Sequence, residues 1–416
     1  VAPRRSRRAR TSGLSREPLS ATAQRGVPRI LYLGPFATMA DRFAVAPLLI
    51  PMAVSYHVSL AAVSGVASLY YLAYGLLPPA YGVLADRFGR VRVIRAALVG
   101  TAVADVLSAL SPNLTALLVA RFITGGIACG VMPTTLVYLA DRFPFTVRQQ
   151  AITNVLVFVA LGTAAGTLGA GLTAHALTWR VFFLFPGAIA VGVAIALRRV
   201  PESLVTRSSQ NPLRQVAGVL RHGWALFLLA VAVLVGAVMF GFITYLAPAL
   251  EATGQSPAIA GVVVATYGLS VLICTRAFRY VARRTPAALI LAGGATMLLI
   301  GYLVAATAQS VPAILAASVL AGGAYAFMQS TFQTWATDVV PEARATATSL
   351  FATAIFTGAA VATSGVAGLA GAHRYSSLFT IAAIVTLPVL IIGSLARWRY
   401  PGSDAIDEAP PGSQIG

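Results

Sequence analysis

The stretch "GVLADRFGRVR" (residues 82–92) holds four charged side chains between two long apolar runs. The run before it extends over about 61–84 and the run after it over about 92–110. Each is close to the length of about 20 residues that a helix needs to cross a bilayer, and the charged stretch cannot follow them into lipid. The sequence therefore predicts two membrane-spanning helices joined by a loop that lies in water at one membrane surface.

The composition extends this interpretation to the whole chain. Of its 416 residues, 58% are hydrophobic and 10% are charged, and the mean hydropathy is +0.81, whereas soluble domains carry about 25% charged residues. The formal charge of +18 comes from arginine, since the sequence contains no lysine. The arginines gather in short segments between apolar runs, as in membrane proteins. We therefore expect a lipid bilayer as the partner and do not expect nucleic acid.

Twelve apolar runs are long enough to span the membrane. They lie at about 30–55, 61–84, 92–110, 114–139, 149–174, 180–198, 223–248, 257–276, 286–307, 312–337, 345–370 and 376–396. Arg-rich connections alternate with connections whose only arginines are Arg180 and Arg374. Because cytoplasmic loops retain positive charge, this alternation predicts a multi-pass protein of the cell (inner) membrane with both termini in the cytoplasm.

A polar linker divides the chain into two related halves. The predicted domains are a disordered basic tail (1–28), a six-helix bundle (29–198), a linker (199–221), a second six-helix bundle (222–397) and a second tail (398–416). The spacing from Arg148 to Trp179 equals that from Arg344 to Tyr375, in segments of similar composition. Such a repeat indicates duplication, and two bundles around a central cavity are typical of transporters.

The charged loop also carries a family resemblance. It resembles the signature G-x-L-A-D-R-x-G-R-R between the second and third helices of the major facilitator superfamily, and Val91 departs from it where a second basic residue is expected. The matching residues are Gly82, Leu84, Ala85, Asp86, Arg87, Gly89 and Arg90. The resemblance covers essentially the whole chain. It implies an all-α membrane protein with twelve transmembrane helices in two pseudo-symmetric six-helix bundles, of the drug/proton antiporter-like branch.

In the family this loop forms part of a latch that closes the cytoplasmic side and breaks when the transporter opens inward. We expect Gly82 to allow close helix packing and Gly89 to allow a tight turn. We expect Asp86 to accept hydrogen bonds from the start of the eleventh helix near Arg344, and Arg90 to pair with Asp141. The predicted latch residues are Gly82, Asp86, Arg87, Gly89, Arg90 and Asp141. A plain positively charged loop is the alternative.

Charged residues also occur inside the predicted spans. Arg121 and Gly125 in "LLVARFITGG" resemble the superfamily element l-x-x-x-R-x-x-x-G of the fourth helix. A buried Arg is costly in lipid and persists beside an acid or in a wet cavity. Asp41, about eleven residues into the first helix, is the expected partner, because the first and fourth helices face each other in this fold. A carboxyl group balanced between burial and a nearby Arg can bind a proton in one conformation and release it in another.

The proton-coupling site is therefore predicted at Asp41, Arg121, Arg42 and Asp105, with Asp105 placed nearer the outer surface as a relay. A static buried ion pair is the alternative. In the fifth span, "GTAAGTLGAG" (162–171) resembles the antiporter element g-x-x-x-G-P-x-x-G-G at Gly162, Gly166 and Gly171. Thr167 replaces the proline, and ordinary close helix packing also favours such glycines.

The substrate cavity is predicted from aromatic and polar side chains. On one face of the tenth span these are Tyr325, Met328, Gln329, Phe332 and Gln333. Further lining residues are predicted among Met39, Tyr71, Tyr74, Met132, Phe158 and Tyr245. A surface of this kind suits an amphipathic organic molecule. Core packing is the alternative for each residue.

These features predict a monomeric exporter that moves a small amphipathic compound or drug by antiport against protons. The proton gradient is the expected energy source, with no cofactor or metal, because the sequence offers no nucleotide-binding loop and no metal-ligand or nucleophile set. We do not expect an enzyme. The alternatives are an exporter of sugars or amino acids, an uptake symporter of the same fold, and a membrane sensor that does not transport.

Overall fold

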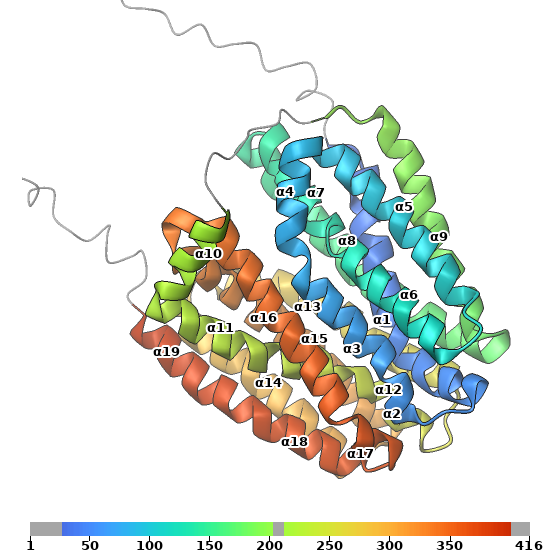
Figure 1. The fold of residues 1–416 in the computed structure, drawn as a ribbon. Coiled ribbons are helices and arrows are strands. Elements are labelled where there is room, and N and C mark those ends of the chain that lie inside the picture. Colours follow the sequence, from blue (N-terminus) through green and yellow to red (C-terminus); the bar gives the residue numbers. More distant parts are fainter. Residues whose placement is uncertain (1–26, 203–211, 401–416) are drawn as a thin grey trace, which may run out of the picture.

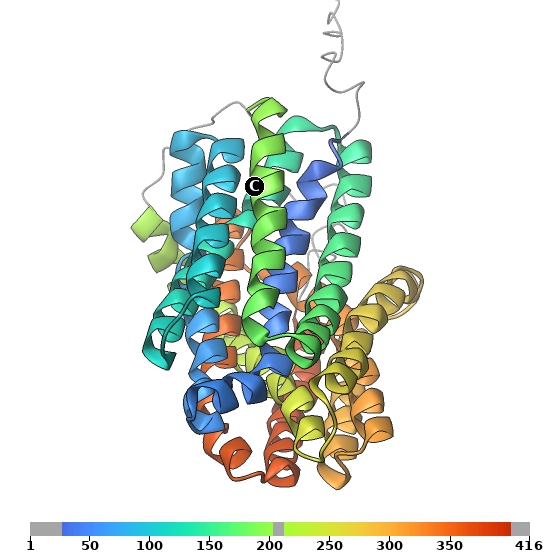
Figure 2. The ribbon, with the colours of Figure 1, turned by 90° about the vertical axis from the view of Figure 1, so that its right-hand side faces the viewer.

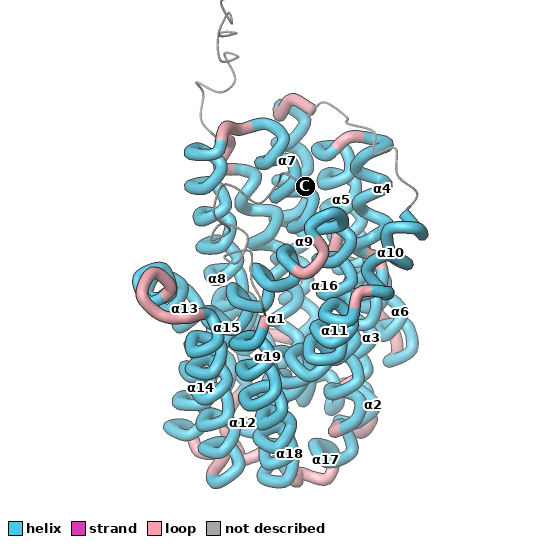
Figure 3. The backbone as a smooth tube through the Cα atoms, turned by 90° about the vertical axis from the view of Figure 1, so that its left-hand side faces the viewer, coloured by secondary structure: helices cyan, strands magenta, loops and turns pink. Residues whose placement is uncertain are grey.

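The computed structural model describes residues 27–202 and 212–400, which form helices and short connections without a strand (Figure 3). The prediction of an all-α protein is confirmed for this part of the chain. The predicted tails, apart from residues 27–28 and 398–400, and residues 203–211 of the predicted linker lie outside the described residues.

The first half contains long helices that follow the predicted spans, some of them divided. Its elements are α1 (Ile30–Tyr56), α2 (Leu60–Val63), α3 (Gly65–Leu76), α4 (Pro78–Phe88), α5 (Arg90–Ala109), α6 (Leu114–Ala128), α7 (Val131–Arg142), α8 (Phe145–Ala176), α9 (Trp179–Ala196) and the 3₁₀ turn η2 (Leu197–Arg199). Side chains cap several of the starts. Asn113 accepts a hydrogen bond from Ala116 N in α6, and Thr178 accepts one from Arg180 N in α9, which satisfies backbone donors that the helix leaves free.

The second half repeats this organisation. Its elements are α10 (Pro212–Arg221), α11 (Gly223–Gly236), the π-helical turn η3 (Ala237–Gly241), the 3₁₀ turn η4 (Phe242–Tyr245), α12 (Leu246–Glu251), α13 (Pro257–Val281), α14 (Ala287–Thr307), α15 (Val311–Asp338), η5 (Pro341–Ala343), α16 (Arg344–Gly365), α17 (Ala367–Gly371), α18 (Tyr375–Pro388), the π-helical turn η6 (Val389–Gly393) and α19 (Ser394–Arg399). Helix α10 lies in the predicted linker, where the sequence predicts no helix.

The described residues contain ten spans that are long and apolar enough to cross a membrane. The segment α2–α4 is an eleventh if its two parts, bent by 49°, form one span. The remaining predicted span, at about 92–110, is α5. This helix carries Arg90, Arg92, Arg95 and Asp105, too much charge to cross on apolarity alone, and it packs against α6, α7 and α9. The chain is a multi-pass membrane protein.

Local sequence accounts for the main breaks in the spans. The bend between α3 and α4 falls where Pro78 and Pro79 begin the new helix, because a proline ring clashes with the turn before it. The fourth span divides between α6 and α7 at Cys129 and Gly130. The seventh span passes through η3 and η4 before it resumes as α12. Backbone of this kind at membrane depth is tolerated where protein buries it or where it lines a cavity.

The two halves meet through two pairs of helices. In Figure 1 the first half runs from blue to green and the second from lime to red, and the contacts between them are mainly α3 with α16 and α8 with α13. In the order of spans, these pairs are the second with the eleventh and the fifth with the eighth. A shift by six spans exchanges the two pairs, so the contacts obey the two-fold pseudo-symmetry that the repeat predicts.

The halves are close together at one end and farther apart at the other. We call the end that holds the Arg-rich loops after α4, α7 and α13 the basic end. Figure 1 shows the halves together around α2, α12 and α17 and diverging toward α4 and α10. Helices α2 and α17 are in contact at this end, and Figure 2 shows both at the lower end of the molecule. The two halves therefore diverge toward the basic end.

Candidate functional site

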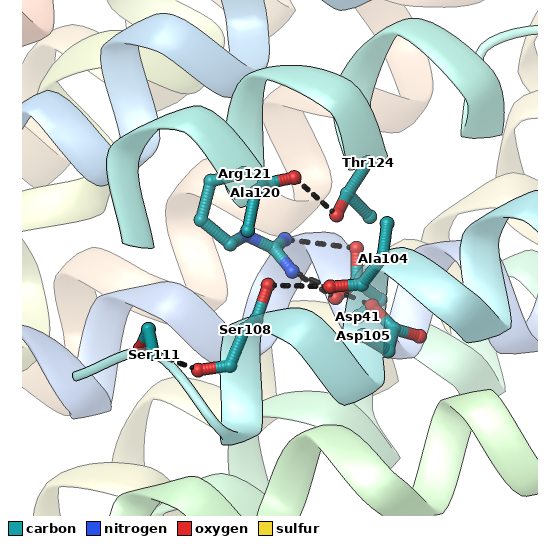
Figure 4. Close-up of polar contacts among 8 residues, drawn as sticks. All are labelled: Asp41, Ala104, Asp105, Ser108, Ser111, Ala120, Arg121 and Thr124. Atoms are coloured by element: carbon teal, nitrogen blue, oxygen red, sulfur yellow. Dashed lines mark hydrogen bonds and ion pairs between the residues drawn. The ribbon is translucent and has the colours of Figure 1, made fainter. Parts of the chain in front are cut away.

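Asp41 on α1 and Arg121 on α6 form a buried ion pair inside the first half (Figure 4). Arg121 Nη1 donates to Asp41 Oδ1 at 2.6 Å, Nη2 donates to Oδ2 at 2.9 Å, and both side chains are fully buried. The guanidinium also lies over the rings of Tyr70 and Phe183, at 4.9 and 4.8 Å from their centroids. The contact predicted between the first and fourth spans is therefore present, in the two-pronged geometry that fixes an arginine in one orientation.

Asp105 on α5 lies beside this pair, a contact that the sequence analysis did not predict. Its Oδ1 lies 3.5 Å from Arg121 Nη1, and its side chain is fully buried. The reason is the packing of α5 between α6 and α9, where a Cβ on Gly187 of α9 would lie 3.4 Å from the Asp105 Cβ. Neither carboxyl oxygen of Asp105 accepts a hydrogen bond from the described residues. One guanidinium thus faces two carboxyl groups and fully satisfies only one.

Arg42 follows Asp41 in the sequence but points to different neighbours. Its guanidinium carbon lies 5.0–5.4 Å from the centroids of four rings, those of Phe43, Tyr74, Phe240 and Phe356. Nη2 contacts the Met39 sulfur at 2.9 Å, and none of the ion pairs found among the described residues includes Arg42. Aromatic faces attract a cation. We call Arg42 and these four rings the Arg42 cage.

A small cavity of about 20 Å³ lies beside the Arg42 cage, between the two halves. Its walls come from α1, α3 and α8 on one side and from η3, η4 and α13 on the other. They are Arg42, Phe43, Val45, Ala46, Tyr71, Thr167, Phe240, Ile243, Thr244, Val264 and Tyr267. The hydroxyl groups of Tyr71 and Thr244 are 3.4 Å apart across the interface. The cavity holds about one water molecule and is lined by both halves.

A second cavity of about 620 Å³ lies between α1 and α8 toward the basic end. Arg29, Tyr32, Gln150 and Asn154 provide its polar groups, and the predicted residue Phe158 lies on its wall. Other predicted lining residues lie at the Arg42 cage and at the small cavity between the halves, which we call the central cavity. They are Met39, Tyr71, Tyr74 and Tyr325.

The remaining predicted lining residues pack elsewhere. Tyr245, Met328 and Phe332 are fully buried in the core of the second half. Tyr245 donates to Thr363 O at 2.5 Å, Phe332 stacks on a tryptophan ring, and Met328 lies against Gly294. Met132 packs against the core of the first half, and Gln329 is half-buried. The predicted stripe on the tenth span thus divides, with Tyr325 toward the centre and Met328 and Phe332 in the core.

The predicted latch residues partly come together at the basic end. Arg90, the first residue of α5, forms ion pairs with Asp86 of α4 and with Asp141 of α7. The distance from Arg90 Nε to Asp141 Oδ2 is 3.3 Å. Asp86 therefore contacts Arg90 and not the start of the eleventh span. Gly89 has a φ of +98°, as its tight turn requires. Among the described residues, no atom from outside its own stretch of helix lies within 4 Å of a Cβ placed on Gly82, so the close packing predicted there is absent in this conformation.

Two further features of this loop complete its description. Arg87 lies over the ring of Phe88. Glu202, which the sequence analysis did not single out, accepts hydrogen bonds from Val91 N at 2.7 Å and Arg92 N at 3.1 Å. A carboxylate at the start of a helix is favourable because of the free donors and the positive end of the helix dipole. Its position soon after the basic run at 198–199 carried no signal for a contact with residues about 110 positions earlier.

The glycines of the fifth span allow three close approaches of backbone. A Cβ placed on Gly162 would lie 2.4 Å from Phe36 O, and one on Gly166 would lie 2.2 Å from Ala40 O, both on α1. A Cβ on Gly171 would lie 2.4 Å from Pro257 O of α13. Close packing, the alternative considered for this motif, is therefore present, and α8 links α1 to the second half.

The arrangement of spans and site defines a class of protein. Two pseudo-symmetric halves that meet around buried charges and a central cavity form the fold of a secondary transporter. The family model of the Major Facilitator Superfamily matches residues 31–363 and 248–412, and the chain belongs to this superfamily. Within the described residues, no group of three His, Cys, Asp or Glu side chains is placed to hold a metal ion.

Known proteins resemble the chain at different levels. The xylose transporter XylE from E. coli, in a partially occluded inward open conformation, superposes with a TM-score of 0.71 at 16% identity, over 90% of this chain and 97% of that one. The niacin transporter NiaP of Acinetobacter baylyi is 34% identical over 123 residues, which are 30% of this chain and 28% of that transporter. The multidrug resistance protein MdtG of Proteus mirabilis is 25% identical over 262 residues, 60% of this chain and 65% of MdtG. The matches thus span less than two thirds of these two relatives.

Proposed function

We propose that this chain is a proton-coupled transporter that exports a small amphipathic organic compound by antiport. The observation that supports the proposal most directly is the group formed by Asp41, Asp105 and Arg121, in which two buried carboxyl groups share one guanidinium. When two such groups interact strongly, the protonation of each depends on the other and on where the cation sits.

The geometry suggests how a proton enters the cycle. In the described conformation Arg121 donates two hydrogen bonds to Asp41, whereas Asp105 accepts none from the described residues. We therefore expect Asp105 to be the carboxyl group that carries a proton. The side chains that face Asp105 are Arg121 of α6 and Asp41 of α1, while α9 presents the uncharged Gly187. A shift of α1 against α6 transfers Arg121 from Asp41 to Asp105, and the proton then moves to the other carboxyl group or leaves.

The orientation follows from the charge pattern. We place the basic end in the cytoplasm, because Arg-rich loops remain there, so that both termini are cytoplasmic and the described conformation is open inward. The cell membrane supplies the proton gradient, worth about 2.3 kcal/mol per charge per 100 mV, and no cofactor is required. One chain contains both halves and works as a monomer. The pairing of Asp86, Arg90 and Asp141 serves as the part of the latch that stays within the first half.

Uptake by symport is the second candidate. The relative with the highest identity of those compared above is a niacin transporter, and niacin is a pyridine carboxylic acid. The multidrug relative favours export over a longer alignment. The two directions differ in which membrane orientation accumulates substrate when a pH gradient is imposed.

Vesicles of both orientations test the proposal. We expect everted vesicles that contain the protein to accumulate an amphipathic probe from a panel of dyes and aromatic acids when the interior is acidic, and to lose it with a protonophore. Asp105→Asn should lower this accumulation at least tenfold, whereas Glu342→Gln, at an exposed acid outside the site, should not change it. Accumulation by right-side-out vesicles with acid outside supports symport instead. If neither orientation responds to the gradient for any probe, the proposal is wrong.

A further inference from the structure

The strongest unexplained feature of the site is the positive charge of Arg42. Only 6% of its surface is exposed, its Nε has no hydrogen-bond partner among the described residues, and Nη2 reaches only the Met39 sulfur. The neighbouring carboxyl of Asp41 forms its ion pair with Arg121 and none with Arg42 among the described residues. Thioether sulfur is a weak acceptor. Burying a guanidinium at membrane depth without an acidic partner is unfavourable in free energy. The attraction between the cation and the surrounding aromatic rings offsets part of this penalty.

The position of Arg42 is that of a substrate-binding group. Of the four rings around it, Phe43 and Tyr74 belong to the first half, and Phe240 and Phe356 belong to the second. The guanidinium therefore lies where the halves meet, on the wall of the central cavity. A ligand bound there contacts both halves and leaves when they separate.

We infer that the Arg42 cage binds the carboxylate of a planar aromatic monoanion of the benzoate class, and that this anion is the transported substrate. The inference rests on the proposed function and names the substrate class for the same cavity. It holds for export and for uptake, because it concerns what binds at Arg42 and not the direction of transport.

The charge and shape of the site select this class. Arg42 is the one charged residue among those that line the cavity, so the site matches one negative charge and not the several charges of a phosphate ester. A guanidinium binds a carboxylate with two parallel hydrogen bonds. The surrounding rings offer faces on which a flat ring stacks.

The cavity also offers hydroxyl groups beside the cation. Tyr267 lies on the cavity wall, and its hydroxyl has no hydrogen-bond partner among the described residues. Thr167 and Thr244 line the same space. The Tyr267 hydroxyl suits the carboxylate of the ligand. The two threonine hydroxyls donate to backbone carbonyl oxygens, so they suit a ring substituent that donates a hydrogen bond. With about 20 Å³ free, the site is collapsed, and we expect η3 and η4, whose backbone is not α-helical, to move when it fills.

Binding to the purified full-length protein tests the inference without a proton gradient. The probes are benzoate, the neutral isostere benzamide, and cyclohexanecarboxylate, which keeps the charge and loses the flat ring. We expect calorimetry to give benzoate at least tenfold higher affinity than benzamide, with cyclohexanecarboxylate between them. Arg42→Gln should lower the affinity for benzoate at least tenfold and leave the affinity for benzamide unchanged. Arg42→Lys keeps the charge but cannot donate two parallel hydrogen bonds, so its affinity for benzoate should lie between those of Arg42→Gln and the unaltered protein. The matched control is Arg95→Gln, since Arg95 bonds Ala194 O away from the cavity.

The outcomes separate this inference from the proposed function. Asp105→Asn should retain benzoate binding while it loses gradient-driven transport. If benzoate and benzamide bind equally, or if Arg42→Gln folds and binds benzoate as the unaltered protein does, the inference is wrong. If a neutral or cationic probe is transported in a gradient-dependent way and benzoate does not bind at millimolar concentration, the substrate class is wrong while proton coupling stands. If Arg42→Gln does not fold, the ratio between benzoate and benzamide in the unaltered protein still decides.

Discussion

Asp41→Asn perturbs the buried ion pair with the smallest change in shape. The amide keeps one oxygen for one prong of Arg121, so the variant loses one of two charge-assisted hydrogen bonds, at 2.6 and 2.9 Å, together with the charge that balances Arg121. Removing one partner of a buried pair costs about 3–5 kcal/mol. Because Asp105 remains 3.5 Å from Arg121 Nη1 and takes up part of the lost interaction, we expect a loss of about 3 kcal/mol in the free energy of unfolding.

Unfolding by graded addition of SDS in mixed micelles, followed by tryptophan fluorescence, measures this loss. The matched control is Asp86→Asn, the same substitution in an ion pair whose acid is 35% exposed, where we expect about 0–1 kcal/mol. The double variant of Asp41→Asn with Arg121→Gln removes both charges and should be about 2 kcal/mol more stable than the sum of the single effects predicts. If Asp41→Asn costs no more than Asp86→Asn, the pair does not hold α1 to α6 in the way described.

Two more substitutions test the packing and the basic end. Gly166→Ala places a Cβ 2.2 Å from Ala40 O, a backbone atom that cannot rotate away, so we expect the free energy of unfolding in SDS to fall by about 1–3 kcal/mol. The control Gly192→Ala, whose new Cβ has no atom of the described residues within 4 Å, should be neutral. Equal effects of the two substitutions would contradict the close approach of α1 and α8. Glu202→Gln weakens the cap on α5, because the amide replaces the carboxylate that accepts from Val91 N and Arg92 N. If the cap stabilises the start of the helix by about 1 kcal/mol, these two backbone amides should exchange with deuterium about fivefold faster in the variant. Unchanged exchange at both would contradict the capping role.

The sequence predicted the fold and, within the buried charge group, the contact between Asp41 and Arg121. The bilayer itself requires apolar spans and favours Arg-rich loops on one side, so these patterns located the spans to within a few residues. Helix α5 is the predicted span that carries too much charge to cross lipid on its apolarity alone. Asp41 and Arg121 were paired because an isolated charge in a span needs a partner. The contact of Asp105 with Arg121 was not predicted, since depth in the membrane does not determine which way a helix is turned, and only the packing of α5 against α6 brings the two side chains together.

The cavity was harder to predict for a related reason. A helix inside a bundle of spans is apolar on every side, so the stripe on the tenth span gave no sign that Met328 and Phe332 lie in the core while Tyr325 faces the centre. The Arg42 cage takes its rings from residues up to about 310 positions apart, in both halves. No local pattern encodes such a contact. The charge of Arg42 was visible in the sequence, and its lack of an acid was not.

The charged groups of α5 and α6 also have a consequence for how the chain is made. Asp41 and Asp105 leave the ribosome before Arg121 does, and a charged side chain at the centre of a span costs about 2.5–3.5 kcal/mol during insertion through the translocon. Helix α5 bears three arginines near its start in addition to Asp105, so we expect it to insert poorly as a separate segment. We expect it to enter the membrane together with α6, so that Arg121 arrives as the counter-charge. The guanidinium at the centre of the finished molecule would then influence the order in which the spans insert.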